Sequence, residues 1–227
     1  VDAFSQPSPE PPAPLQDLML ADLWLFRDSN WSPDFPTAAR QAVELYTLTR
    51  DADIDGVIAL DQRAVSLLLG PLGPLEVEGA ERPVTGQNVL QVARQAWAPG
   101  EQISSDWWGG RKDIMGSVLN AAMASLQTGL DREQLVDLAN AALTALGRKH
   151  MLVYLPDPAA AEALRERGWD GALAEPEGDT LMVVDTNMGF NKVNAVVEES
   201  LDYALDLTDP ADPRAALTVR HRHPVAG

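Results

Sequence analysis

Short apolar runs alternate with segments of helical periodicity along most of this chain. Apolar runs of strand length that end in polar or turn-forming residues occupy 18–26, 54–60, 151–155 and 181–184. Apolar residues recur three and four positions apart, the spacing that buries one face of a helix, in 36–49, 62–69, 85–97, 114–126 and 131–146. Leu75 and Val77 alternate with glutamates and predict an exposed strand. The pattern predicts an α/β (α+β) fold with a mixed β-sheet flanked by helices.

Local signals mark where several helices begin and end. Asp61 and Asp157 directly precede helical segments and are predicted N-caps, because a short carboxylate accepts hydrogen bonds from the first free N–H groups. Asp131 and Gln134 have the spacing of a capping box, and Gly147 marks the end of the helix that they open.

Three regions are expected along the chain. Residues 1–14 are rich in proline, which predicts an extended linker. Residues 15–180 form the α/β domain. Residues 181–227 form a β-rich extension, because alternating positions in 194–207 and 217–221 predict a strand and its returning partner on either side of a turn. We expect this extension to pack on the same domain.

Composition excludes several classes of function. The chain has 227 residues, with 17 Lys and Arg against 34 Asp and Glu, and its formal net charge of −17 would repel a phosphate backbone. No nucleic acid is therefore expected as a partner. The absence of cysteine excludes disulfides, thiolate metal sites and a cysteine nucleophile. No run reaches the ~20 apolar residues of a spanning helix, and a chain that begins at Val1 is expected to be a processed piece of a longer one.

Arg27, Asp28, Trp31 and Asp34 form a polar cluster after the apolar run 18–26. A guanidinium at a strand end can bind two phosphate oxygens, and nearby carboxylates can orient it or attract a cation. The alternative is a solvated loop whose Asp34 caps the following helix. Both interpretations stay open from the residues alone.

Arg111 and Lys112 follow a Gly-Gly pair and are predicted to open a helix. A positive helix end with two basic side chains can hold an anion. The alternative is ordinary surface charge, since no phosphate-loop spacing is present.

No metal site is expected. Residues 185–191 place Asp and Asn at alternate positions, as in an EF-hand loop, but Val196 stands where the bidentate Glu is required. A tight turn is the better interpretation. The three histidines are scattered, and although His221 and His223 are spaced to chelate on a strand, a surface role is expected for them.

Four segments together match one known family in order and spacing. They are 25–36 (LFRDSNWSPDFP), 54–61 (IDGVIALD), 111–113 (RKD) and 184–192 (VDTNMGFNK). From about residue 20 to its end, the chain resembles a bacterial envelope family catalogued only as domain-of-unknown-function family four thousand and twelve. That family is distantly similar to the LytR-CpsA-Psr phosphotransferases, which move glycopolymers from a polyprenyl phosphate carrier to the cell wall.

The resemblance implies a LytR-CpsA-Psr-like scaffold and roles for particular residues. Arg27 with Asp28 would correspond to the arginine motif that grips the carrier's pyrophosphate, and Arg111 to a later phosphate-binding arginine, which implies catalytic roles for all three. Trp31, Asp34 and Lys112 are the further expected ligand contacts. The resemblance also implies Mg²⁺, but the acidic residues that hold it in those transferases are not recognisable in this chain.

These expectations lead to two functions. The first is an extracytoplasmic cell-envelope protein, tethered to the membrane through an upstream anchor, that binds a phosphorylated or glycan-containing ligand of the polyprenyl-phosphate type. If it is an enzyme, it is a phosphotransferase in degenerate or partial form. The alternative is a non-catalytic structural or protein-interaction module of the bacterial envelope.

Overall fold

The structure is a computed structural model that describes residues 9–97, 105–174, 178–185, 196–209 and 211–224, without the side chains of 96–97 and 105–113. The chain divides into two compact units, and each is described by itself. Unit 1 comprises Val1–Pro11 and Asp22–Pro176, and unit 2 comprises Pro12–Ala21 and Glu177–Gly227.

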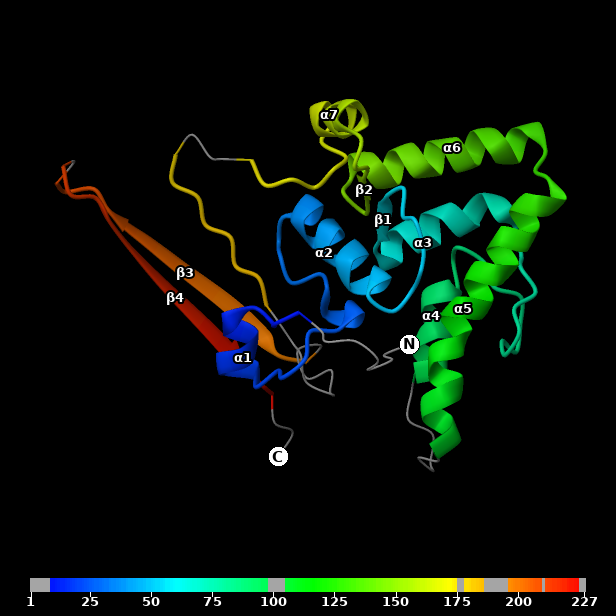
Figure 1. Cartoon of the computed structure of the whole chain (residues 1–227), viewed down its shortest axis with the longest axis horizontal. Helices are drawn as coiled ribbons and strands as arrows, with labels where there is room; N and C mark the ends of the chain where they lie inside the picture. Colours follow the sequence, from blue (N-terminus) through cyan, green and yellow to red (C-terminus); the bar gives the residue numbers. More distant parts are fainter. Residues whose placement is uncertain (1–8, 98–104, 175–177, 186–195, 210, 225–227) are drawn as a thin grey trace. The chain divides into compact units, whose positions relative to one another are not determined.

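Unit 1 combines helices with one two-stranded antiparallel sheet. Its elements in chain order are η1 (Phe26–Asp28), α2 (Phe35–Thr47), β1 (Val57–Leu60), α3 (Gln62–Leu69), η2 (Gly70–Leu72), α4 (Val89–Trp97), α5 (Ser105–Thr128), α6 (Arg132–Gly147), β2 (Met151–Tyr154) and α7 (Pro158–Glu166). Helix α3 packs on α4 and α6, and α5 packs on α4 (Figure 1). Helices α2 and α7 both contact strand β2.

Short acidic residues begin four of these helices, as the sequence predicts for most of them. Asp34, Asp61, Asp131 and Asp157 are the N-caps of α2, α3, α6 and α7, and each side chain accepts a backbone N–H of the first turn. Asp131 and Gln134 complete the predicted capping box. Each cap satisfies donors that the helix itself cannot pair, so these starts are determined locally.

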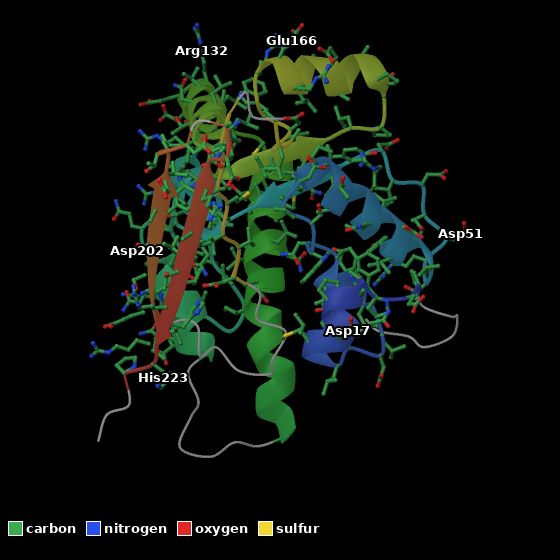
Figure 2. The ribbon with its side chains drawn as sticks, turned by 90° about the vertical axis from the view of Figure 1, so that its left-hand side faces the viewer. Asp17, Asp51, Arg132, Glu166, Asp202 and His223 are labelled. Carbon is green, nitrogen blue, oxygen red and sulfur yellow. The ribbon has the colours of Figure 1, made fainter. Side chains whose placement is uncertain are left out.

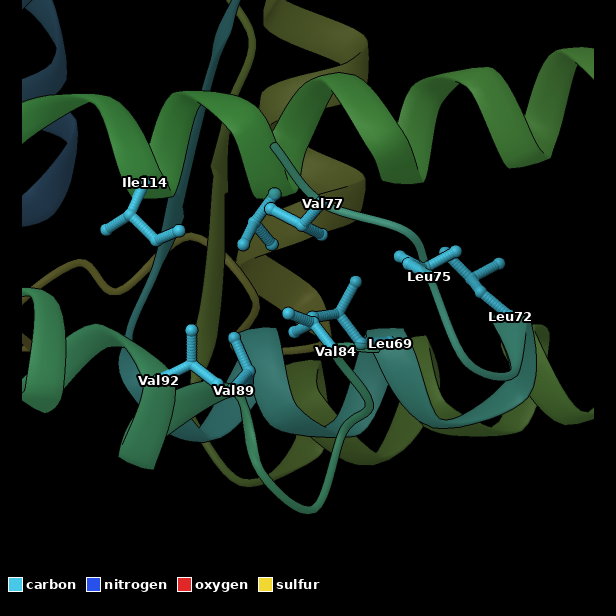
Figure 3. Close-up of a cluster of buried hydrophobic side chains, with 9 residues drawn as sticks. Leu69, Leu72, Leu75, Val77, Val84, Val89, Val92 and Ile114 are labelled. Atoms are coloured by element: carbon cyan, nitrogen blue, oxygen red, sulfur yellow. The ribbon is translucent and has the colours of Figure 1, made fainter. Parts of the chain in front are cut away.

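The core of unit 1 is a cluster of aliphatic side chains between α3, α4 and α5 (Figure 3). Its buried members are Leu69, Leu72, Leu75, Val77, Val84, Val89, Val92, Ile114 and Val118. Val84 and Val89 are among the most completely buried, and the loop between η2 and α4 contributes Leu75, Val77 and Val84 to the cluster. Burial of this apolar surface is the main force that holds the helices together.

Strands β1 and β2 pair over their whole length. Val57 lies opposite Tyr154, and Leu60 lies opposite Met151. On the outer face of β1, Ile58 and Leu60 keep 61% and 45% of their surface exposed. Val57 and Ala59, on the other face of β1, are partly buried.

Unit 2 contains α1 (Ala13–Met19) and the antiparallel hairpin of β3 (Glu198–Asp206) and β4 (Arg214–Arg222). Side chains at odd positions of both strands share one face of the hairpin, and those at even positions share the other. The odd face carries most of the apolar residues, and the even face carries the arginines together with Glu198 and Asp202. Figure 2 shows Asp202 on β3 and His223 just beyond the end of β4.

The α/β (α+β) class is confirmed, and so is the strand-rich C-terminal region. Within the part of the chain that the structure describes, the strands form two separate antiparallel pairs in place of one mixed sheet. Whether the C-terminal extension packs on the preceding domain stays a prediction. Among the described residues, no helix is long and apolar enough to cross a membrane.

Three predicted strands are wrong. The run 18–26 instead contains the end of α1, irregular chain and the turn η1, because proline in the first turn of α1 starts a helix early and Leu20, in the left-handed region, ends it. Residues 181–184 have no regular structure. Leu75 forms only an isolated bridge with Val84, and both Leu75 and Val77 are buried.

Candidate functional site

Arg27 and Asp28 lie in the short 3₁₀ turn η1 and not at the end of a strand. Arg27 Nε lies 3.7 Å from Asp28 Oδ2, and 54% of the arginine side chain is exposed. The indole Nε1–H of buried Trp24 donates to the carbonyl oxygen of Asp28 at 3.1 Å and holds the turn in place. Arg27 is therefore a partly exposed cation on an ordered turn.

The turn η1 and Asp34 lie at opposite ends of α2. Phe26 packs edge-on against Tyr46 near the C-terminal end of α2, with ring centroids 5.3 Å apart. Asp34 caps the N-terminal end, and a 13-residue helix is about 20 Å long. Trp31 is partly buried in the segment between them. The predicted cluster is thus spread along α2 and does not surround a single point.

Asp34 caps α2, which confirms the structural alternative. Its Oδ2 accepts the backbone N–H of Thr37 at 3.0 Å and the Thr37 hydroxyl at 2.6 Å. Its Oδ1 accepts the N–H of Leu173 at 3.1 Å, and Leu173 lies 139 positions later in the sequence, near the C-terminal end of unit 1. Burial raises the pKa of Asp34, but these hydrogen bonds and the charge of Arg40 outweigh burial, so the pKa is lowered.

A cleft of about 350 Å³ opens beside Asp34, and we call it the Asp34 cleft. It lies between the start of α2, the end of β2 and helix α7. Its polar lining residues are Asp34, Arg40, Tyr154, Glu162, Arg165 and Asp170. Proline, valine, leucine and alanine side chains supply the rest of its lining. The structure thus places one predicted ligand residue, Asp34, in a cavity of ligand size.

The charges in the Asp34 cleft are partly engaged. One guanidinium nitrogen of Arg40 donates to the Thr37 hydroxyl at 2.9 Å, and Arg165 pairs with Glu162. An arginine has five N–H donors in a planar fork, so donors beyond these contacts can bind oxygens of a ligand.

Arg111 and Lys112 lie inside α5, more than one turn after its start at Ser105. The prediction that they open a helix is wrong, because the helix continues through Gly109 and Gly110. A glycine inside a helix costs only about 1 kcal/mol, which tertiary contacts can offset. Since the favourable effect of a helix N-terminus on anions fades within the first turn, that support for an anion site at Arg111 is lost. The side chains of Arg111 and Lys112 lie outside the described part of the structure.

Asp61 and His150 form a pair that the sequence did not indicate. Asp61 Oδ1 accepts the N–H groups of Arg63 and Ala64, both at 2.8 Å, while Oδ2 lies 2.7 Å from His150 Nδ1. Burial raises the pKa of Asp61, but hydrogen bonds from Ala64, His150 and Arg63 outweigh it and lower the pKa. The pair joins the end of β1 to the start of β2.

In unit 2, His221 lies next to the carboxylates of Asp185 and Glu199. The sequence did not indicate this grouping, because Asp185, Glu199 and His221 are far apart along the chain. The rest of the EF-hand-like segment, after Asp185, lies outside the described part of the chain.

Comparison with known families gives one result. Residues 2–97 match the family model described as Protein of unknown function (DUF4012). The DUF4012 match supports the family prediction over that segment, which includes Arg27, Asp34, Arg40 and Asp61. It is shorter than expected, because it ends before Arg111 and the later motif at 184–192. No curated protein and no solved structure matches the chain.

Proposed function

We propose that this protein binds a phosphorylated or glycan-containing ligand of the polyprenyl-phosphate type, and that the Asp34 cleft is the binding site. We further propose that it works outside the cytoplasm in the bacterial cell envelope, tethered to the membrane in its full-length form. The proposal concerns binding. The catalytic roles suggested for Arg27, Asp28 and Arg111 stay predictions that rest on resemblance.

The observation that carries the proposal is the presence of two guanidinium groups, Arg40 and Arg165, in one cavity of about 350 Å³. Arginine binds phosphate oxygens through paired N–H groups. The N-terminal end of α7, with Pro158 in its first turn, also borders the cavity and adds positive potential.

The acidic residues of the Asp34 cleft are compatible with such a ligand. Both oxygens of Asp34 accept N–H or hydroxyl groups of the protein, and Asp170 accepts the N–H of Ala172 at 3.2 Å. Glu162 is paired with Arg165. Hydrogen-bonded carboxylates repel an approaching anion less than free ones, and they can still accept sugar hydroxyls. The mixture of acidic, basic and apolar groups suits a sugar phosphate better than a bare phosphate ion.

Titration calorimetry with farnesyl pyrophosphate, a soluble polyprenyl pyrophosphate, tests the proposal. The Arg40→Ala and Arg165→Ala variants should each bind at least about tenfold more weakly, the loss expected when a charge-assisted hydrogen bond is removed. Arg132→Ala is the matched control, because Arg132 is exposed at the far end of α6 and does not line the cleft. Equal affinity in all three variants would remove the Asp34 cleft from consideration.

Arg27→Ala tests the other predicted contact in the same assay. Because Arg27 lies toward the opposite end of α2, it can contribute only if the ligand extends along that helix. A tenfold loss would add η1 to the site, and unchanged affinity would remove Arg27 from it.

A second candidate function is a protein-interaction module, and the helices α5 and α6 favour it. Large apolar side chains remain exposed on both, namely Leu119, Met123, Leu126, Leu135, Val136 and Leu143. Exposed apolar residues concentrated on neighbouring elements often mark an interaction surface. Analytical ultracentrifugation of the protein and of its Leu119→Glu variant separates the possibilities. Concentration-dependent association that the variant abolishes would support this function, and a monomer at all concentrations would exclude self-association through these helices.

A further inference from the structure

We propose that Asp185, Glu199 and His221 form a binding site for a divalent transition metal ion of the zinc type. The ligand atoms of the three side chains lie within 4.8 Å of one another. They come from three segments of unit 2, namely the chain 178–185, strand β3 and strand β4.

The hairpin register places two of the ligands together. Glu199 of β3 lies directly opposite His221 of β4, so both side chains project from the same face. Glu199 Oε2 lies 3.1 Å from His221 Nε2. The pairing of the two strands over nine positions determines this arrangement, so it does not depend on a single flexible side chain.

The third ligand arrives on a segment that is held at two points. Asp185 Oδ1 lies 3.3 Å from His221 Nε2, and Asp179 accepts a hydrogen bond from the Tyr203 hydroxyl. Tyr203 and Glu199 are four residues apart on β3 and share the odd face of the hairpin. The segment 179–185 therefore follows this face and brings Asp185 to its end.

The two distances from His221 to the carboxylates are compatible with metal ligation. Both carboxylates approach the same ring nitrogen, Nε2, which has only one proton to donate in a hydrogen bond. In a tetrahedral zinc site with bonds of about 2.0–2.1 Å, neighbouring ligand atoms are about 3.3–3.4 Å apart. The observed distances of 3.1 Å and 3.3 Å are close to that value. A cation between the three groups would bind both carboxylates and the nitrogen at once.

The charges of the hairpin also favour a bound cation. The arginines of β4 stand at even positions, on the opposite face, where Arg222 Nε lies 3.7 Å from Glu198 Oε2. Among the described residues, the imidazole of His221 is the only basic group that pairs with Asp185 or Glu199. A divalent ion would neutralise the two carboxylates while leaving the imidazole uncharged.

The ligand types select the class of metal. One imidazole nitrogen with two carboxylates suits Zn²⁺ and similar ions, whereas Ca²⁺ and Mg²⁺ prefer oxygen ligands alone. The side chains are partly exposed, at 53% for Asp185, 29% for Glu199 and 49% for His221, so water can complete the coordination. The ion would fasten the segment 178–185 to a hairpin that is otherwise only a two-stranded sheet, a structure of marginal stability in water.

Titration calorimetry of the tag-free full chain with ZnCl₂ tests the site. We expect one ion per chain, and the Glu199→Gln and His221→Ala variants should each bind at least about tenfold more weakly. Glu198→Gln is the matched control, because the neighbouring Glu198 loses the same charge on the opposite face of the hairpin. It should bind zinc as the unchanged protein does.

A second measurement locates the ion independently of affinity. In NMR spectra, zinc should shift the imidazole resonances of His221 before those of His150, which pairs with Asp61 in unit 1. Limited proteolysis within unit 2 should slow on addition of zinc. Undiminished zinc binding in the His221→Ala variant, equal losses in Glu198→Gln and Glu199→Gln, or no shift of His221 would overturn the proposal.

Discussion

Replacing Asp34 by alanine tests whether its main role is structural. The variant removes the cap of α2, which contributes about 1 kcal/mol in most proteins. It also removes the acceptor of the Leu173 N–H at 3.1 Å, a hydrogen bond of about 0.5–1.5 kcal/mol. Leu173 is half exposed, so water can replace part of that second contribution. We therefore expect Asp34→Ala to lower the free energy of unfolding by about 1–2 kcal/mol.

The Asp34→Asn variant is the matched control. Asparagine caps helices about as well as aspartate, but its single side-chain oxygen cannot accept from both Thr37 and Leu173. The variant therefore keeps the cap and loses the contact with Leu173 and the favourable charge at the helix start, the latter about 0.3–1 kcal/mol. Urea unfolding followed by circular dichroism at 222 nm measures both, since α2 to α7 all belong to unit 1. Because the pKa of Asp34 is lowered, its stabilisation is present above the unfolded pKa near 3.8 and lost as the pH falls through the lower folded value. Equal losses in both variants, or no loss with alanine, would refute the capping argument.

Other contacts lead to further expectations. The Asp61–His150 pair should show a coupling of about 0.2–1 kcal/mol in a double-mutant cycle followed by urea unfolding, because it is partly exposed. The pKa of Asp61 is lowered, so its stabilisation should be complete above the unfolded pKa and disappear on acidification; unchanged acid stability in Asp61→Asn would contradict this. Gly86→Ala should destabilise the protein by about 1–3 kcal/mol in thermal unfolding, because a Cβ there would collide with the backbone oxygen of Ser66. Gly116→Ala, in α5 with open space around the added carbon, should instead stabilise the protein by about 0.5–1 kcal/mol, because glycine weakens a helix interior relative to alanine. A lower melting temperature in this variant would contradict that reasoning.

The features predicted well from the sequence are those that depend on nearby residues. The capping box of Asp131 and Gln134 and the cap at Asp157 involve residues three positions apart, so a short segment of sequence is enough to predict them. The run 181–184 has strand composition, but a strand exists only if another segment pairs with it, and that depends on the whole fold. The prediction of an exposed strand at Leu75 and Val77 failed for the same reason, because their burial depends on packing with segments distant in the sequence.

The candidate site could be predicted only in part, for a related reason. Asp34 was identified because it belongs to the polar cluster that follows the apolar run 18–26 and directly precedes a helical segment. Arg165 was not, since an arginine three residues after Glu162 resembles ordinary helical surface charge. Only the packing of α2 and α7 against β2 brings Arg165 and Arg40 into one cavity. The expected helix start at Arg111 failed because the two preceding glycines were interpreted as a break.

The hydrogen bond from Leu173 to Asp34 joins residues 139 positions apart. Strand β1 similarly has no pairing partner until β2 is synthesised, about a hundred residues later. A contact between distant residues cannot form until the later one has left the ribosome, and closing a long loop slows its formation. The nascent chain should therefore hold α2 and β1 without these partners until β2 and Leu173 have been synthesised, and these segments are where a chaperone would be needed.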